Sequence, residues 1–164
     1  MVEAGKTSFI IEKKFLSFQD TYIIKNKEGA QLGKAEKKPF SSNIVFKDND
    51  GNEIFSMKRE LISFHPNYKI LDPEGKLIAK INKKFNLFGA SFSVEDENKE
   101  KIFDVRGDLL NYNYFFIGLN KTVVVRVHKE LIFIRDSFYL DIIEEIDPRI
   151  VLGCCISIDM MRKK

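Results

Sequence analysis

Positively charged side chains gather where several alternating apolar segments of this sequence end. The eight that stand out are Lys37, Lys38, Lys58, Arg59, Lys83, Lys84, Arg126 and Lys129. Clustered ammonium and guanidinium groups suit the binding of anionic headgroups, with a contribution of about 1 kcal/mol per cation near a membrane surface. The competing interpretation is a solvated surface whose charges keep neighbouring molecules apart.

Residues suited to acid–base or nucleophilic catalysis are sparse. No cysteine or carboxylate accompanies His65 or His128 at a catalytic spacing, so two surface histidines are the simpler interpretation. Cys154 and Cys155 are adjacent within an apolar run, which indicates buried, inert thiols rather than a disulfide or a nucleophile. We therefore predict no catalytic residue, no cofactor and no enzymatic activity.

The segment Asp48-Asn49-Asp50-Gly51 has residue types found in calcium loops. An EF-hand has its glycine at position 6, which would put Phe46 at position 1, where an acidic ligand belongs. A hairpin turn fits the same residues, and we predict no metal site.

Composition restricts the class of partner and the compartment. The 27 Lys and Arg nearly balance the 24 Asp and Glu, and the 15 Phe at inward-facing spacing indicate core rather than base stacking, so no nucleic-acid role is expected. Two cysteines form no disulfide framework, which favours a cytoplasmic setting. No signal peptide is expected, and the longest uncharged apolar run, residues 150–158, is too short for a bilayer span.

The elements that must position the charged residues repeat along the chain. Polar turns recur about every 23 residues, at Gly29, Gly51 and Gly75, with Asn98 and Asn120 in similar places. Each interval holds two strands with apolar residues at alternate positions. The roughly twelve strands predicted in this way favour an antiparallel barrel or a sandwich.

The last part of the chain breaks this alternation. Asp147-Pro148 is typical of a helix start, and the apolar run that follows predicts a helix over 147–161 that is buried on every side. A buried final strand is the alternative. A helix inside the barrel would fill a lumen too wide for side chains alone, and Gly33, Ala35 and Ala79 would make room for it.

Three stretches together resemble the LURP-one-related family of the tubby C-terminal-like superfamily, which also includes the phospholipid scramblases. They are residues 48–59, residues 68–81 and the closing run from Asp147 to Asp159. The resemblance implies a closed twelve-stranded barrel around a central hydrophobic C-terminal helix, and a membrane-lipid or regulatory role without catalysis. It carries over no binding residue, because no phosphoinositide or calcium motif matches residue by residue.

These observations lead to one architecture and two candidate functions. We expect a single domain over 1–164, with strands within 9–146, and a monomer. The turns would form an acidic rim of the barrel, and the eight cations a basic rim at its other end. The leading hypothesis is a peripheral association with anionic phospholipid. The alternative is a protein-interaction or regulatory module without a lipid role, and an enzyme or small-ligand carrier ranks below both.

Overall fold

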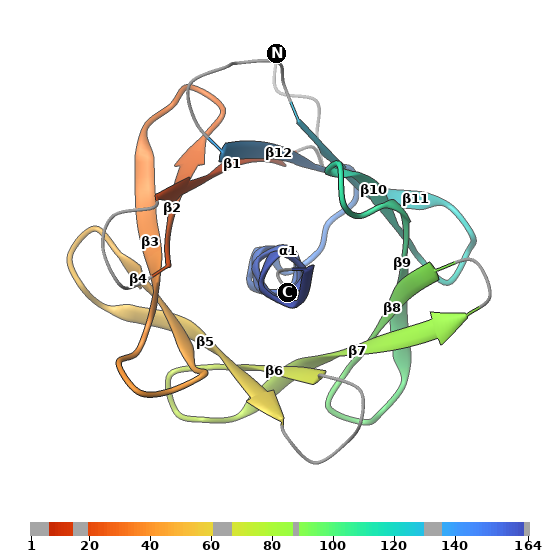
Figure 1. Ribbon diagram of the computed structural model, residues 1–164, viewed down its shortest axis with the longest axis horizontal. Helices are drawn as coiled ribbons and strands as arrows, with labels where there is room; N and C mark the ends of the chain where they lie inside the picture. The colour runs from red at the N-terminus through yellow and green to blue at the C-terminus, as the bar shows by residue number, and fades with distance from the viewer. Residues whose placement is uncertain (1–6, 15–19, 61–66, 87–88, 130–135, 163–164) are drawn as a thin grey trace.

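A computed structural model describes residues 7–14, 20–60, 67–86, 89–129 and 136–162, which form twelve β-strands and one α-helix (Figure 1). The elements are β1 (Thr7–Lys14), β2 (Thr21–Asn26), β3 (Gln31–Lys37), β4 (Ile44–Asp48), β5 (Glu53–Glu60), β6 (Asn67–Leu71), β7 (Leu77–Asn86), β8 (Gly89–Glu95), β9 (Lys101–Asp108), β10 (Asn113–Ile117), β11 (Val123–His128), β12 (Asp136–Ile142) and α1 (Pro148–Arg162).

The strands form a closed antiparallel barrel. Each strand pairs with the strands before and after it in the chain, and β1 closes the ring by pairing with β12. Phe9 lies opposite Leu140 across this closing pair, and Ile11 lies opposite Phe138. A closed ring leaves no strand edge open to another chain. The predicted barrel of about twelve strands is confirmed, and the sandwich alternative is wrong.

Alternate strand residues fill the interior. On β5, Phe55 and Met57 are buried while Lys58 is exposed, as a period of two requires. The Phe46 and Phe55 rings stack with centroids 5.0 Å apart. Most Phe side chains whose burial the structure describes thus belong to the core, as expected, but Phe40 is fully exposed.

Five hairpin turns of one type form the acidic rim. In each turn, one backbone N–H donates to the carbonyl three residues earlier at 3.0–3.1 Å. The donor has a positive φ in all five turns, and the five donors are Gly29, Gly51, Gly75, Lys99 and Lys121. The equivalence predicted for Asn98 and Asn120 is therefore wrong by one residue. Lysine rarely adopts a positive φ, so its type gave no sign of this position.

The aspartates of the acidic rim hold these turns together. Asp48 Oδ1 accepts the N–H groups of Asp50 and Asn52, each at 2.9 Å. The Asp72 and Asp96 carboxylates accept the two corresponding N–H groups of their own turns. The segment that has calcium-loop residue types is thus a hairpin turn.

Helix α1 lies inside the ring of strands (Figure 1). It follows β12, which ends at the acidic rim, and its Asp159 contacts Lys13 near the opposite end of the barrel. Asp147 Oδ1 accepts the backbone N–H of Arg149 at 3.0 Å and caps the helix start. Every residue of 151–159 is buried, so the predicted central helix is correct to within one residue at each end, and the final-strand alternative is wrong. In the described part of the chain, no helix has the length and apolar character to cross a membrane.

The helix backbone comes closest to β5, β6 and β7. Gly153 permits this approach, because a Cβ there would lie 2.8 Å from Cδ1 of Ile70. The expectation that Gly33 makes room for the helix is wrong, since a Cβ at Gly33 would meet Phe46 at 2.8 Å. The glycine that matters for helix insertion lies on the helix itself.

Candidate functional site

The eight predicted cations all lie toward one end of the barrel. Each is on an odd-numbered strand near its C-terminal end, or directly after it. All neighbouring strands are antiparallel, so these ends meet at the rim opposite the five tight turns. The structure therefore brings Lys37, Lys38, Lys58, Arg59, Lys83, Lys84, Arg126 and Lys129 to the basic rim.

Strand alternation divides the basic rim into two sets of four. Lys37, Arg59 and Lys83 continue the inward positions of their strands and lie opposite Ile44, Tyr68 and Phe92, which are buried. Lys129 follows the same parity after Val127. We name Lys37, Arg59, Lys83 and Lys129 the mouth cations. The outer cations, which follow the opposite parity, are Lys38, Lys58, Lys84 and Arg126.

Much of this positive charge is not compensated by nearby acids. Within the described ranges, no ion pair involves the side chains of Lys37, Lys38, Lys58, Arg59, Lys84 or Arg126. Glu60 ends β5 at the basic rim, directly after Arg59, but its carboxylate bonds Lys69 at 2.7 Å and Lys80 at 3.0 Å, which are not among the eight predicted cations. The basic rim therefore presents a positive potential to solvent.

A fifth inward cation, Lys13, was missed by the sequence analysis. Its Nζ lies 3.1 Å from Asp159 Oδ2, and both side chains are buried. The hydroxyls of Tyr22 and Tyr112 donate to the same carboxylate, each at 2.6 Å. Lys13 precedes Lys37 by 24 residues, and Lys83 follows Arg59 at the same spacing, so the repeat could have identified it.

The partners of Asp159 keep it ionised in the interior. Burial raises the pKa of this carboxyl, but the hydroxyls of Tyr112 and Tyr22 and the ammonium of Lys13 outweigh burial and bring the pKa below its usual value. The burial of Tyr22 and the neighbouring charge of Asp159 raise the pKa of the Tyr22 hydroxyl far above its usual range. Lys13, Tyr22, Tyr112 and Asp159, which we call the Asp159 cluster, thus fasten the end of α1 to the wall.

Among the described residues, the potential catalytic groups around His128 do not form a catalytic arrangement. His65 lies outside the described residues. His128 does have a carboxylate partner, contrary to the sequence interpretation: its Nε2 is 3.3 Å from Asp141 Oδ2. Ser8 Oγ donates to Asp141 Oδ1 at 2.6 Å, so the carboxylate stands between the hydroxyl and the imidazole. In a Ser-His-Asp triad the imidazole occupies that middle position and removes the proton.

The two cysteines are fully buried on α1, as the sequence predicted. Burial raises the pKa of the Cys155 thiol to about 12 and that of Cys154 well above its usual value. Thiols in this environment are poor nucleophiles.

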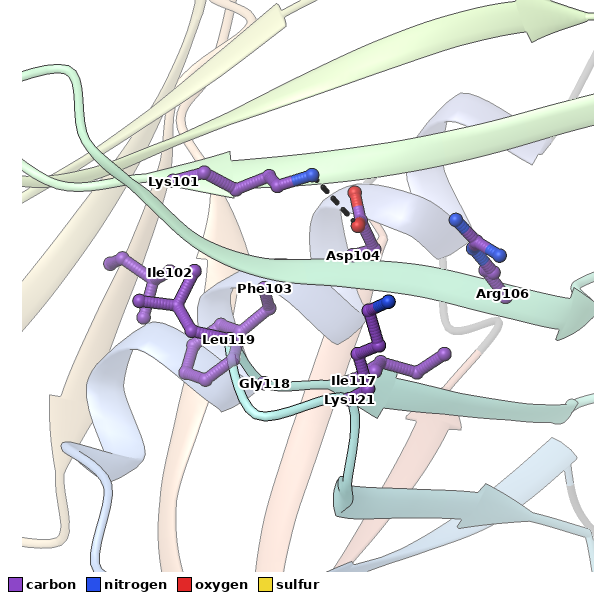
Figure 2. A pocket seen from close by; sticks show the side chains of 9 residues that line it. All are labelled: Lys101, Ile102, Phe103, Asp104, Arg106, Ile117, Gly118, Leu119 and Lys121. Atoms are coloured by element: carbon purple, nitrogen blue, oxygen red, sulfur yellow. Dashed lines mark hydrogen bonds and ion pairs between the residues drawn. The ribbon is translucent and has the colours of Figure 1, made fainter.

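A cleft of about 420 Å³ lies on β9 and the turn that follows β10 (Figure 2). Lys101 reaches Asp104 there, with an Nζ to Oδ2 distance of 2.9 Å, and the side chains of Arg106 and Lys121 lie nearby. None of the predicted site residues lines this cleft. Its cations and the exposed Leu119 suit the binding of an acidic, partly apolar segment.

Comparisons with known proteins agree with this architecture. A sequence model of the LURP-one-related family matches residues 7–159. The X-ray structure of a protein from Arabidopsis thaliana is similar, with a TM-score of 0.70 and 13% sequence identity over 96% of this chain and 93% of that chain. This structural likeness concerns the fold alone. No curated protein matches the sequence.

Proposed function

This chain belongs to the LURP-one-related family, and from that premise we propose that it is a non-enzymatic barrel module that associates with anionic phospholipid surfaces through its basic rim. The observation that carries the proposal is the gathering of eight cations at one end of the barrel, six of them without an ion pair to any described residue. A cytoplasmic location with peripheral membrane attachment belongs to the same proposal.

The charge distribution supports a defined orientation on a membrane. Cations near an anionic surface contribute about 1 kcal/mol each, and this attraction falls off within a Debye length of roughly 8 Å at physiological salt. Three of the five turns of the acidic rim carry the aspartates Asp48, Asp72 and Asp96. The two ends of the barrel therefore differ in their response to an anionic surface, and the basic rim is the end that is attracted.

The mouth cations have a competing structural role. They face the end of the lumen where α1 ends, and cations near a helix C-terminus are favourable for its unpaired carbonyls. The outer cations point away from the lumen and have no such role. Comparing the two sets therefore separates membrane attraction from helix stabilisation.

Vesicle flotation tests the proposal. Wild-type protein should float with vesicles containing phosphatidylserine or a phosphoinositide at low salt, and far less with pure phosphatidylcholine. Replacing all four outer cations by Gln should lower the affinity by at least about 100-fold without changing the melting temperature. Binding should also weaken in high salt. The absence of wild-type flotation with every anionic vesicle at low salt would contradict the proposal.

A protein-interaction module is the second candidate, and the cleft beside Leu119 favours it. A partner that binds at the basic rim predicts that charge reversal at Lys37, Lys38, Lys83 and Lys84 leaves membrane association unchanged but disturbs capture of that partner. A partner that binds in the cleft predicts that the same four changes leave its capture intact, because none of these residues lines the cleft. Charge reversal at Arg106 and Lys121 is the matched test of the cleft. If a protein partner binds in the cleft, these two substitutions should abolish its capture. If the protein acts on membranes through its basic rim, they should leave flotation intact.

A further inference from the structure

We infer that the barrel docks with its basic rim against the bilayer and inserts Phe40 and Leu110 among the lipid acyl chains. This inference rests on the proposed function and adds to it a docking orientation and an apolar contact. It uses two residues that are absent from the predicted cation set and that belong to neither the cleft nor the Asp159 cluster.

Phe40 is held away from the barrel by the loop that carries it. Its side chain is 110% exposed and its φ is 55°. The loop between β3 and β4 is closed by hydrogen bonds from Lys38 N to Asn43 O at 2.8 Å and from Asn43 N to Ser41 Oγ at 3.0 Å. A positive φ is unfavourable for phenylalanine, so this loop keeps a strained residue exposed instead of relaxing.

Leu110 occupies the matching place in the connection between β9 and β10. It is 68% exposed, and the turn around it is fixed by Asp108, whose Oδ2 accepts from Asn111 Nδ2 at 2.7 Å. In a closed barrel of twelve strands, the β3–β4 and β9–β10 connections lie six strands apart and so on opposite sides of the mouth. Figure 1 shows β3 and β4 across the ring from β9 and β10.

The neighbouring charges indicate a membrane as the occupant. Lys37 ends β3, Lys38 is the first residue of the loop of Phe40, and the other cations of the basic rim lie around the same mouth. Two apolar tips on opposite sides of a ring of cations complement a flat surface with anionic headgroups above an apolar layer. A bilayer satisfies both requirements over the width of the barrel.

The chain contains no tryptophan, so a single introduced tryptophan reports its own environment. Phe40→Trp and Leu110→Trp are the test variants. Leu119→Trp is the matched control, because Leu119 is 72% exposed but lies on the acidic rim. The vesicles contain four parts phosphatidylcholine to one part phosphatidylserine, with and without bromine on the acyl chains.

The emission of both test variants should shift to shorter wavelength on vesicle binding and should be quenched by the brominated lipid, whereas that of Leu119→Trp should not change. Phe40→Ser should weaken vesicle binding about tenfold at an unchanged melting temperature, since its side chain contacts no core.

Each other result has a distinct meaning. If the proteins float with the vesicles but the Phe40→Trp emission stays unshifted and unquenched, the insertion is wrong and the proposed function stands. This result is the one expected if Phe40 and Leu110 serve to contact a protein instead of the acyl chains. If only the control shifts, the barrel docks by its acidic rim and the orientation is wrong. If wild-type protein does not float, the proposed function fails and this inference fails with it.

Discussion

The two rims of the barrel are built on different principles. The acidic rim repeats one turn five times, with the same hydrogen bond and the same positive φ in each. At the basic rim the described connections differ from one another: the β3–β4 loop exposes Phe40, while the β9–β10 turn buries Tyr112 and exposes Leu110. One end thus repeats a single turn geometry, and the other carries connections that differ in geometry and in the side chains they expose.

The largest effect should come from the helix that joins the two rims. Ile156 is fully buried, and Ile156→Asp should prevent folding because an unpaired charge inside the lumen costs several kcal/mol. Circular dichroism and thermal unfolding measure this effect. Leu119→Asp on the acidic rim is the control and should change stability by no more than about 0.5 kcal/mol. A wild-type melting temperature for Ile156→Asp would refute the central-helix structure.

The Asp159 cluster should show that the basic rim also holds a stabilising element. Asp159→Asn leaves the buried ammonium of Lys13 without its carboxylate and should lower the free energy of unfolding by about 3–5 kcal/mol. Asp104→Asn removes the half-buried partner of the exposed Lys101 and should cost less than about 1 kcal/mol. Urea unfolding measures the free energy of unfolding of both variants. Equal decreases in the two would show that the buried pair contributes no more to stability than the surface pair.

The same cluster predicts a dependence on pH. The folded-state pKa of Asp159 is lowered, so its stabilisation is complete above the unfolded pKa of about 3.9 and is lost as pH falls through the folded value. The stability difference between wild type and Asp159→Asn should therefore be largest near neutral pH and shrink below about pH 4. Exposed aspartates titrate alike in both proteins, so their contributions cancel in the stability difference. A difference that stays constant down to pH 2.5 would argue against an ionised Asp159.

The smallest effect should come from making the acidic rim more uniform. Lys99 and Lys121 occupy positions that the other three turns give to glycine. Lys99→Gly should raise the free energy of unfolding by up to about 1 kcal/mol, because glycine adopts a positive φ without steric cost. Gly75→Ala is the opposite change and should lower it by a similar amount. Thermal unfolding checks both, and neither should alter flotation.

The barrel and its helix could be predicted because they depend on local patterns. The alternation of apolar residues, the turn residues and the helix start at Asp147-Pro148 can all be identified in the sequence. The Asp159 cluster was not predicted, because Lys13 and Asp159 are far apart in sequence and meet only when the barrel closes around the helix.

The exposure of Phe40 was missed for a different reason. Hydrophobic residues are expected inside, and only the loop geometry shows which one is held outside. The charges of the basic rim were found because they repeat, although their division into mouth and outer cations required the strand register.

The central helix has a consequence for how the protein is made. During synthesis all twelve strands emerge before residues 148–162. The ring cannot close until β12 has been made, because β12 is the strand that pairs with β1. Contacts between such distant segments form slowly, and partly folded chains expose apolar surface in the meantime. We expect the nascent barrel to remain open until residues 148–162 have left the ribosome, so that helix insertion and ring closure complete folding together.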